Sequence, residues 1–380
     1  MKNKFKNNQV KIKKLILAVG LPILLIIFGV IFIFSNISFA AQAADNIARP
    51  ILGEKNTIHL EAVYFNLQDK INSLKYLVSG QQAPVFYSGK MLKKEKFMSL
   101  GQMNLNQLNI SNNLTPLNGE GQWIPIIQNL YPKQVIIART FIRPDTSRPY
   151  AIVSLVKMDM KKLAIGAQAG TYYPGGPHKI YGLGIVPKNI QNSNNLLAVF
   201  NGGFQEKDGH YGMIVGNTTY VPLRNNLATL LLYKDGSIKL INYTGQKLDP
   251  NVLAVRQNGP FLIKNGKITS FVEQGPDTWG RTTTNSMYTW RSGVGITKNG
   301  NLIYAVGNSL IPKTLAQALL SAGAQNALQL DINPFWVRFI LYASKGNGQY
   351  NYFPLLASMQ NGGYQYLHGY NKDFFYVYKK

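Results

Sequence analysis

From about residue 133 to the C-terminus, short apolar runs rich in β-branched and aromatic residues alternate with polar turn dipeptides. In three places an apolar run, an Asp-Gly or Asn-Gly pair and a second apolar run follow one another directly. These segments read LLLYKDGSIKLINY, FLIKNGKITSFV and GVGITKNGNLIYAV. Asn-Gly and Asp-Gly supply the positive-φ positions that tight hairpins require. The pattern therefore predicts three β-hairpins within an antiparallel-rich sheet.

One helical pattern interrupts the predicted strands. The segment IPKTLAQALLSAGAQ has Pro312 in its first turn and Gly323 at its end, which are favoured positions for these residue types. Four residues recur between them at helical spacing: Leu315, Ala318, Leu319 and Ala322. The segment NALQLDI follows and predicts a return to the sheet. We therefore expect an α+β fold, in which an antiparallel-rich mixed β-sheet with hairpins packs with a few helices.

The N-terminal region has a different pattern. Residues 1–14 are basic, and Leu15 to Phe34 form an apolar run without a charge. A run of this length spans a bilayer as a helix, and the preceding lysines favour a cytoplasmic N-terminus. We predict one transmembrane helix at residues 15–36, which anchors the chain in the cell membrane as a single-pass protein with an extracytoplasmic C-terminal body. The segment SFAAQAAD resembles a signal-peptidase site, but the apolar run is long for a cleaved signal.

Between the predicted anchor and the predicted sheet, residues 45–132 contain two segments with different sequence patterns. The segment HLEAVYFNLQDKINSLKYLVS predicts an amphipathic helix, with Leu60, Val63, Tyr64, Leu67, Ile71 and Leu74 on one face. From about residue 80 to residue 130 the chain is rich in Asn, Gln, Gly and Ser, which is typical of an irregular linker. The predicted order is thus a basic tail (1–14), an anchor (15–36), this region (45–132) and one domain (133–380).

The net positive charge of the chain indicates which kinds of binding partner are favoured. The 380 residues include 40 Lys and Arg but only 16 Asp and Glu, a formal charge of +24. Such a charge favours polyanions, namely nucleic acid, anionic lipid or phosphate-bearing surface polymers. Because the body is expected outside the cytoplasm, we expect an anionic glycopolymer of the cell envelope and no nucleic acid. A solvated basic surface without a specific partner is the alternative, and the oligomeric state is not determined by the sequence.

Residue usage also limits the chemistry. The chain has no cysteine, which excludes disulfides, thiolate catalysis and Cys-ligated zinc. Its four histidines are widely separated and form neither an HxxxH nor an HxH pair. We therefore expect no cofactor and assign no metal ligands. Carboxylates and carbonyls could hold a divalent cation, but no sequence signature supports one.

Polar residues follow several of the predicted strands. LLAVF leads into Asn201-Gly202-Gly203, VLAV leads into Arg256-Gln257-Asn258, and NALQL leads into Asp331-Ile332-Asn333. Arg291 stands at the start of another strand, in TWRSGVGI. Each segment alone is more typical of a turn than of a site. Together they predict a convergent polar site at one rim of the sheet.

The same segments carry a resemblance to a known family. In the order NGGF, RQNGPFLIKNG, RSGVGITKNG, TLAQALLSAG and QLDINP, the chain resembles the phosphodiester glycosidase family over roughly Leu196 to Pro334. The animal member of this family removes N-acetylglucosamine from an α-linked phosphodiester. The family usually has Leu-Asp-Gly-Gly where this chain has Leu330-Asp331-Ile332-Asn333. The resemblance implies a hydrolase whose site includes Asn201, Gly202, Gly203, Arg291 and Asp331.

The residue types suit that reaction. Arg291 can pair with two phosphate oxygens, and Arg256 is a second candidate for this task. Asp331 can stabilise an oxocarbenium-like state, attack it or activate water. The next catalytic candidates are Glu206, as a second carboxylate, and His210, as a proton donor. The remaining predicted substrate-binding residues are Asn201, Gly202, Gly203, Asn258 and Asn333.

We therefore predict a membrane-anchored extracytoplasmic glycosidase that hydrolyses sugar-1-phosphodiester linkages in a surface or cell-wall glycopolymer, such as an exopolysaccharide. Two alternatives remain open. The same fold could bind anionic glycopolymer without catalysis, which the scarcity of acids and the Ile332-Asn333 departure favour. It could also be a polymer-modifying transferase whose acceptor is not water.

Overall fold

A computed structural model describes residues 51–52, 67–86, 103, 105–126, 135–176, 180–280 and 288–380. Residues 65–380 form one compact unit. Within the described ranges no helix is long and apolar enough to cross a bilayer. The predicted span at residues 15–36 lies outside these ranges. The described part of the predicted amphipathic helix is helical at residues 67–79.

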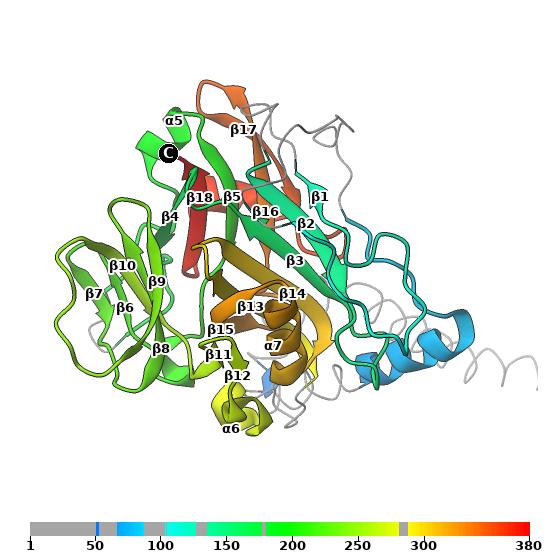
Figure 1. The fold of residues 1–380 in the computed structure, drawn as a ribbon. Helices are drawn as coiled ribbons and strands as arrows, with labels where there is room; N and C mark the ends of the chain where they lie inside the picture. Colours follow the sequence, from blue (N-terminus) through cyan, green and yellow to red (C-terminus); the bar gives the residue numbers. More distant parts are fainter. Residues whose placement is uncertain are drawn as a thin grey trace, which may run out of the picture. The chain divides into compact units, whose positions relative to one another are not determined.

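Three β-sheets make up the folded unit (Figure 1). The eight-stranded sheet has the order β1 (Ile124–Pro125), β2 (Ile137–Ile142), β3 (Val153–Met158), β14 (Leu302–Leu310), β13 (Thr289–Thr297), β15 (Ala324–Ile332), β11 (Phe261–Lys264) and β12 (Lys267–Ile268). The second sheet has the order β7 (Thr218–Val221), β6 (Met213–Val215), β10 (Val252–Gln257), β8 (Leu227–Tyr233) and β9 (Ile238–Tyr243). The third has the order β17 (Gln349–Pro354), β16 (Phe339–Gly346), β5 (Leu196–Asn201), β18 (Phe374–Lys379) and β4 (Leu163–Gln168).

Few helices accompany the sheets. Besides the helical residues 51–52 and 67–79, the described helices are α5 (Lys188–Asn192), α6 (Pro276–Trp279), α7 (Pro312–Ser321) and α8 (Gly363–His368), with 3₁₀ turns η3 (Glu206–Asp208) and η4 (Ser270–Glu273). The strand pairings among the described residues are all antiparallel. The predicted α+β class, sheet-rich and antiparallel with few helices, is thus confirmed.

The three predicted hairpins are confirmed as β8–β9, β11–β12 and β13–β14. Their turns differ in detail from the expectation. Only the Asn265-Gly266 turn has two positive φ angles, 51° and 72°. In the other two turns only the glycines, Gly236 and Gly300, have positive φ. A type I turn closed by a left-handed glycine explains this difference, because it needs only one such position.

Helix α7 forms as the sequence predicts, with Pro312 in its first turn and Gly323 just beyond its end at a φ of 98°. It packs against β13, β14 and β15 (Figure 1). Leu315 and Leu319 are fully buried in a cluster that contains Leu155 and Ile303 from the eight-stranded sheet. The apolar face identified by its spacing is therefore the face that covers one side of this sheet.

The main core lies among the three sheets. Phe200, Phe339 and Phe375 of the third sheet join one buried cluster with Tyr304 of the first sheet and Leu230 of the second. Their neighbours in sequence, such as Ile303 on β14, face the α7 cluster instead. This alternation follows from the period of two in a strand. Because the three sheets pack around one core, the ends of β5, β10 and β15 lie close together.

Candidate active site

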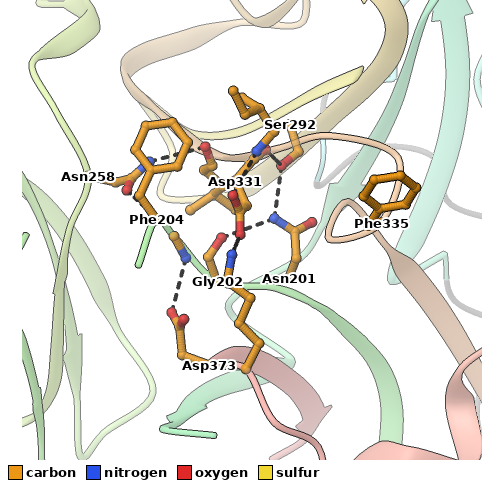
Figure 2. Close-up of polar contacts among 12 residues, drawn as sticks. Asn201, Gly202, Phe204, Asn258, Ser292, Asp331, Phe335 and Asp373 are labelled. Atoms are coloured by element: carbon orange, nitrogen blue, oxygen red, sulfur yellow. Dashed lines mark hydrogen bonds and ion pairs between the residues drawn. The ribbon is translucent and has the colours of Figure 1, made fainter. Parts of the chain in front are cut away.

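Strand ends from all three sheets meet in one polar cluster (Figure 2). Asn201 ends β5 of the third sheet, Asn258 follows β10 of the second, and Asp331 lies near the end of β15 in the first. All three side chains are buried, with exposed fractions of 3%, 1% and 3%. The predicted convergence of these polar strand ends is therefore seen in the structure.

Asn201 connects the third sheet to the first. Its Nδ2 donates to the Oγ of Ser292 at 2.9 Å, and its Oδ1 accepts from the hydroxyl of Tyr304 at 2.8 Å. The Ser292 Oγ in turn donates to the backbone oxygen of Asp331 at 2.8 Å. These bonds use the donor and acceptor atoms of the Asn201 amide, so its side chain fixes the position of the β15 end.

The glycine turn lies where only glycine fits. A Cβ on Gly202 would stand 2.0 Å from Oδ2 of Asp373, and one on Gly203 would stand 2.7 Å from Oδ1 of Asn258. The backbone oxygen of Gly202 accepts a hydrogen bond from the N–H of Asp331 at 3.0 Å. The two glycines are therefore required for close approach of backbone and side chains.

A buried ion pair holds the outer side of this turn. Oδ2 of Asp373 accepts hydrogen bonds from Nε of Arg256 at 2.9 Å and from the N–H of Gly203 at 3.0 Å. Arg256 also donates to the backbone oxygens of Phe204, at 2.6 Å, and Tyr211, at 3.3 Å. The structure thus places the Arg256 guanidinium among internal partners. Binding a phosphate there would require these contacts to be exchanged.

Asn258 joins the second sheet to the first. Its Nδ2 donates to the backbone oxygens of Gln329, at 2.8 Å, and Leu330, at 3.1 Å. Its Oδ1 accepts from the N–H of Phe204 at 2.8 Å. The amide therefore holds the glycine turn against β15 and sets the distance between them.

Asp331 forms an ion pair with Lys372, which precedes β18. Its Oδ2 contacts the Lys372 Nζ, and its Oδ1 accepts from the N–H of Ile332 at 2.9 Å. The two side chains are only 4% and 3% exposed. Burial lowers the pKa of Lys372 to about 7, and the negative charge of Asp373 acts in the opposite direction. The adjacent Asp331 carboxylate also favours the charged ammonium, so we expect it to oppose the effect of burial.

Trp336 covers the ion pair on one side. The Lys372 Nζ lies 4.6 Å from the centre of its ring, a cation–π distance. On its other side, Trp336 meets the ring of Tyr173 edge-on at 6.2 Å. The segment after Asp331 thus places an aromatic side chain over the charged pair.

Arg291 lies on the opposite face of β13 from Ser292. Its guanidinium donates to the backbone oxygens of Leu310 and Trp279, at 3.0 and 2.9 Å, and to Oε1 of Gln329 at 2.8 Å. Its exposed fraction is 0%, and this burial lowers its pKa to about 9. Strand alternation explains the separation, because Ser292, and not Arg291, faces the Asn201 cluster.

Glu206 and His210 lie together on η3 and its exit. Oε1 of Glu206 contacts Nδ1 of His210, and their side chains are 23% and 65% exposed. Glu206 lines a surface pocket, whereas Asp331 is buried with Lys372. The two carboxylates ranked highest from the sequence therefore have different surroundings.

The departure from the family pattern has two structural parts. Asn333 has a φ of 84°, a region in which glycine is favoured and asparagine is tolerated. Ile332 is 6% exposed and packs in a cluster with Phe204 and Tyr211. A Cβ on Gly280 would meet the Ile332 side chain at 2.9 Å. Asn333 thus adopts the left-handed backbone that glycine favours, while the Ile332 side chain packs against Phe204 and Tyr211 and close to Gly280.

Lys372 and Asp373 did not emerge from the sequence as site residues. They occur in YNKDFF, just before the C-terminal strand and beyond the segment that carries the family resemblance. The available signal was an adjacent Lys-Asp pair at the entry of an apolar strand, the same kind of polar strand end found elsewhere in the chain. Antiparallel pairing of Phe374 with Asn201 brings this pair to the glycine turn.

The described residues contain no group of three or more His, Asp or Glu side chains arranged to hold a metal ion. The cluster itself is built from two carboxylates, each neutralised by a cation: Asp331 by Lys372 and Asp373 by Arg256. Among the described residues, two buried carboxylate oxygens have no hydrogen-bond partner: Oδ1 of Asp373, and Oδ2 of Asp331, which contacts Lys372 as an ion pair. The site thus combines fixed amides, a glycine turn and paired charges.

Comparison with known proteins relates one part of the chain to a family of known sequence. Residues 194–331 match the sequence model of the phosphodiester glycosidase family. This segment is about a third of the chain, and it contains Asn201, Asn258, Ser292 and Asp331 but neither Lys372 nor Asp373. Over this segment the chain is similar to the phosphodiester glycosidase family, whose members are hydrolases.

Three solved structures are similar to the chain. The first is the catalytic domain of zebrafish N-acetylglucosamine-1-phosphodiester alpha-N-acetylglucosaminidase auto-inhibited by its pro-peptide, at 14% identity and a TM-score of 0.41, covering 67% of this chain and 86% of that one. A hypothetical protein from Synechocystis has 12% identity and a TM-score of 0.29, with coverage of 64% and 62%. An exported protein from Burkholderia pseudomallei has 9% identity and a TM-score of 0.27, with coverage of 60% and 74%. No curated protein matches the sequence.

Proposed function

We propose that this chain is a membrane-anchored, extracytoplasmic glycosidase that hydrolyses sugar-1-phosphodiester linkages in a surface or cell-wall glycopolymer. The observation that carries the proposal is the position of Asp331. Within the family-matched segment, its carboxylate stands at the strand end between the Gly202 turn and the Lys372 ammonium. A carboxylate can stabilise an oxocarbenium-like state, and a neighbouring cation can pair with phosphate oxygens.

In the proposed reaction, the bond between the anomeric carbon and the phosphate oxygen breaks, and its electron pair leaves with the phosphate. Water supplies the new oxygen on the sugar and loses one proton, so the products are a free sugar and a phosphomonoester. Asp331 stabilises the developing positive charge on the sugar or activates the water. Lys372 releases Asp331 to the sugar and pairs with the phosphate as charge accumulates on it.

Two further features support the anchored, polymer-directed part of the proposal. The apolar run from Leu15 to Phe34 follows a basic N-terminal tail, which favours a membrane anchor with an external body. The net charge of +24 favours a polyanionic substrate such as a phosphate-linked glycopolymer. We assign no cofactor to the reaction.

The test uses the full-length chain, purified in detergent and incubated with the 4-nitrophenyl diester of N-acetylglucosamine-1-phosphate and with a panel of other sugar-1-phosphodiesters, with and without a chelator. We expect wild type to release free sugar and Asp331→Asn to lose at least about a thousandfold in kcat/KM, equivalent to roughly 4 kcal/mol of transition-state stabilisation. Ser237→Ala, a change in the exposed β8–β9 turn, is the matched control and should leave turnover unchanged. Sugar release that persists in Asp331→Asn would contradict the assignment, and a loss of activity on chelation would reveal a metal requirement.

One observation favours a second candidate, a domain that binds anionic glycopolymer without cleaving it. Asp331 and Lys372 neutralise each other, and both side chains are almost fully buried. Reversible, salt-sensitive retention of phosphate-linked polymer, with no free sugar released by wild type, would support this candidate over the hydrolase.

A further inference from the structure

A second feature lies on the surface beside the ion pair. Residues Tyr172–Gly176, Tyr181 and Gln205–Lys207 line a pocket with a volume of about 250 Å³. We call it the tyrosine pocket. Its two halves come from the loop after β4 and from the turn after β5. A hydrogen bond from the N–H of Glu206 to the oxygen of Pro174, at 2.7 Å, holds the halves together.

Aromatic rings form much of the pocket surface. Tyr172 and Tyr181 are 57% and 49% exposed, so both rings are accessible to a ligand. Their rings are nearly parallel, at 9°, with centres 5.9 Å apart. Tyr173 meets Tyr172 edge-on at 4.8 Å, which fixes the arrangement from inside. Exposed, mutually supported rings offer flat apolar faces with polar hydroxyl edges.

Polar groups of the opposite half complete the pocket. The Oε1 of Gln205 is buried and has no hydrogen-bond partner among the described residues. The Glu206 carboxylate lies beside it, held by His210, and Lys207 adds a positive charge to the lining. A buried acceptor without a donor is costly, so this position favours a ligand that carries a hydroxyl or amide N–H.

The tyrosine pocket is linked to the candidate active site through two rings. Tyr173 in the pocket contacts Trp336 at 6.2 Å, and Trp336 lies 4.6 Å from the Nζ of Lys372, the partner of Asp331. A ligand in the pocket would therefore lie two aromatic side chains from the charged pair. That arrangement suits neighbouring units of one extended substrate.

We propose that the tyrosine pocket binds one pyranose unit of the glycan substrate. The apolar C–H face of a pyranose packs on aromatic rings, while its hydroxyls bind donors and acceptors at the ring edge, and Tyr172, Tyr181 and Gln205 supply these groups. The inference deepens the proposed function and rests on it for the nature of the polymer, but the binding of a sugar can be measured separately.

The experiment measures binding to the full-length chain in detergent by titration calorimetry. The probes are the methyl α-glycosides of glucose, galactose and N-acetylglucosamine and the corresponding sugar-1-phosphates, none of which is a phosphodiester. The variants are Tyr172→Ala/Tyr181→Ala and the conservative Tyr172→Phe/Tyr181→Phe, which keeps both rings. Tyr364→Ala is the matched control, because Tyr364 is also 57% exposed but belongs to α8.

We expect at least one probe to bind, and the Ala pair to raise its Kd by about tenfold or more through loss of two ring contacts. The Phe pair should retain most of the affinity, and Tyr364→Ala should match wild type. Affinity unchanged in the Ala pair, or no binding of any probe at millimolar concentration, would overturn the inference. Ring-dependent binding without phosphodiester hydrolysis would keep the pocket and reject the proposed reaction. Hydrolysis with an unchanged KM in the Ala pair would support the proposed reaction and reject the pocket as a substrate-binding site.

Discussion

The Lys372 ammonium contacts the Asp331 carboxylate and joins the end of β15 to the residues that precede β18. Both side chains are excluded from solvent, so each compensates the burial of the other. The pair is therefore both the centre of the candidate site and a structural connection between two sheets.

This pairing predicts a non-additive mutant cycle. Asp331→Asn should lower the free energy of unfolding by roughly 3 kcal/mol at pH 6, because it leaves the Lys372 ammonium buried without a partner. The loss should be smaller at pH 9, since burial favours the neutral amine. The double variant with Lys372→Met should recover part of the loss. Urea unfolding at both pH values measures the cycle, and additive effects would contradict a direct pairing.

The glycine turn predicts a sharp difference between two Gly→Ala changes. In Gly202→Ala the new Cβ would stand 2.0 Å from the Asp373 carboxylate, which has little room to move, so we expect a loss of about 2–4 kcal/mol. Gly275→Ala is the control, because a Cβ there meets nothing within 4 Å and its φ is −74°. Thermal unfolding of the two variants compares them. Equal midpoints would mean that the turn yields more readily than its contacts indicate.

The left-handed backbone of Asn333 predicts which substitutions it accepts. Asn333→Gly should keep or slightly raise stability, whereas Asn333→Ala should lose about 1 kcal/mol at a φ of 84°. Chemical denaturation of both variants checks the order. If Ala were the more stable of the two, backbone conformation would not be what selects the residue here.

The burial of Lys157 predicts that the stability of the fold depends on pH. Burial lowers its pKa from 10.5 to about 8, and its Nζ lies 4.7 Å from the centre of the Trp123 ring. Between pH 8 and pH 10.5 the unfolded chain binds more protons at this residue than the folded chain does. Its contribution to the free energy of unfolding should therefore rise with pH across that window, by up to roughly 3 kcal/mol.

Comparison with Lys157→Met isolates this contribution, because methionine retains the apolar stem and cannot titrate. The stability gain of wild type between pH 7.5 and pH 9.5 should exceed that of the variant. Parallel pH profiles would show that Lys157 keeps a normal pKa in the folded state.

Local patterns in the sequence were sufficient for the hairpins and for α7. The turn dipeptides between β8 and β9 and between β13 and β14, and the Leu315–Leu319 face, depend on neighbouring residues and are confirmed. The polar strand ends at Asn201, Asn258 and Asp331 were also visible locally. These three residues converge because the three sheets pack against one another. The sequence indicates the convergence only indirectly, since polar residues at several strand ends are expected to lie together.

Other features required long-range pairing. Lys372 reaches Asp331 only because β18 lies beside β5, and no spacing rule relates these segments. Strand alternation places Arg291 and Ser292 on opposite faces of β13. Which of the two residues faces the site depends on which face of β13 packs against α7. The tyrosine pocket likewise joins the loop after β4 to the turn after β5. The direction of each side chain and its neighbours in other sheets could thus not be predicted from the sequence alone.

The dependence of the cluster on all three sheets has a consequence for biogenesis. A nascent chain that has been synthesised through β15 already contains Asp331, Asn201 and Asn258, but Lys372 and Asp373 are still to come. Until β18 inserts beside β5, the Asp331 carboxylate has no counter-ion and the Gly203 N–H has no acceptor from Asp373. The two ion pairs of the cluster therefore form only after β18 has been synthesised and has paired with β5.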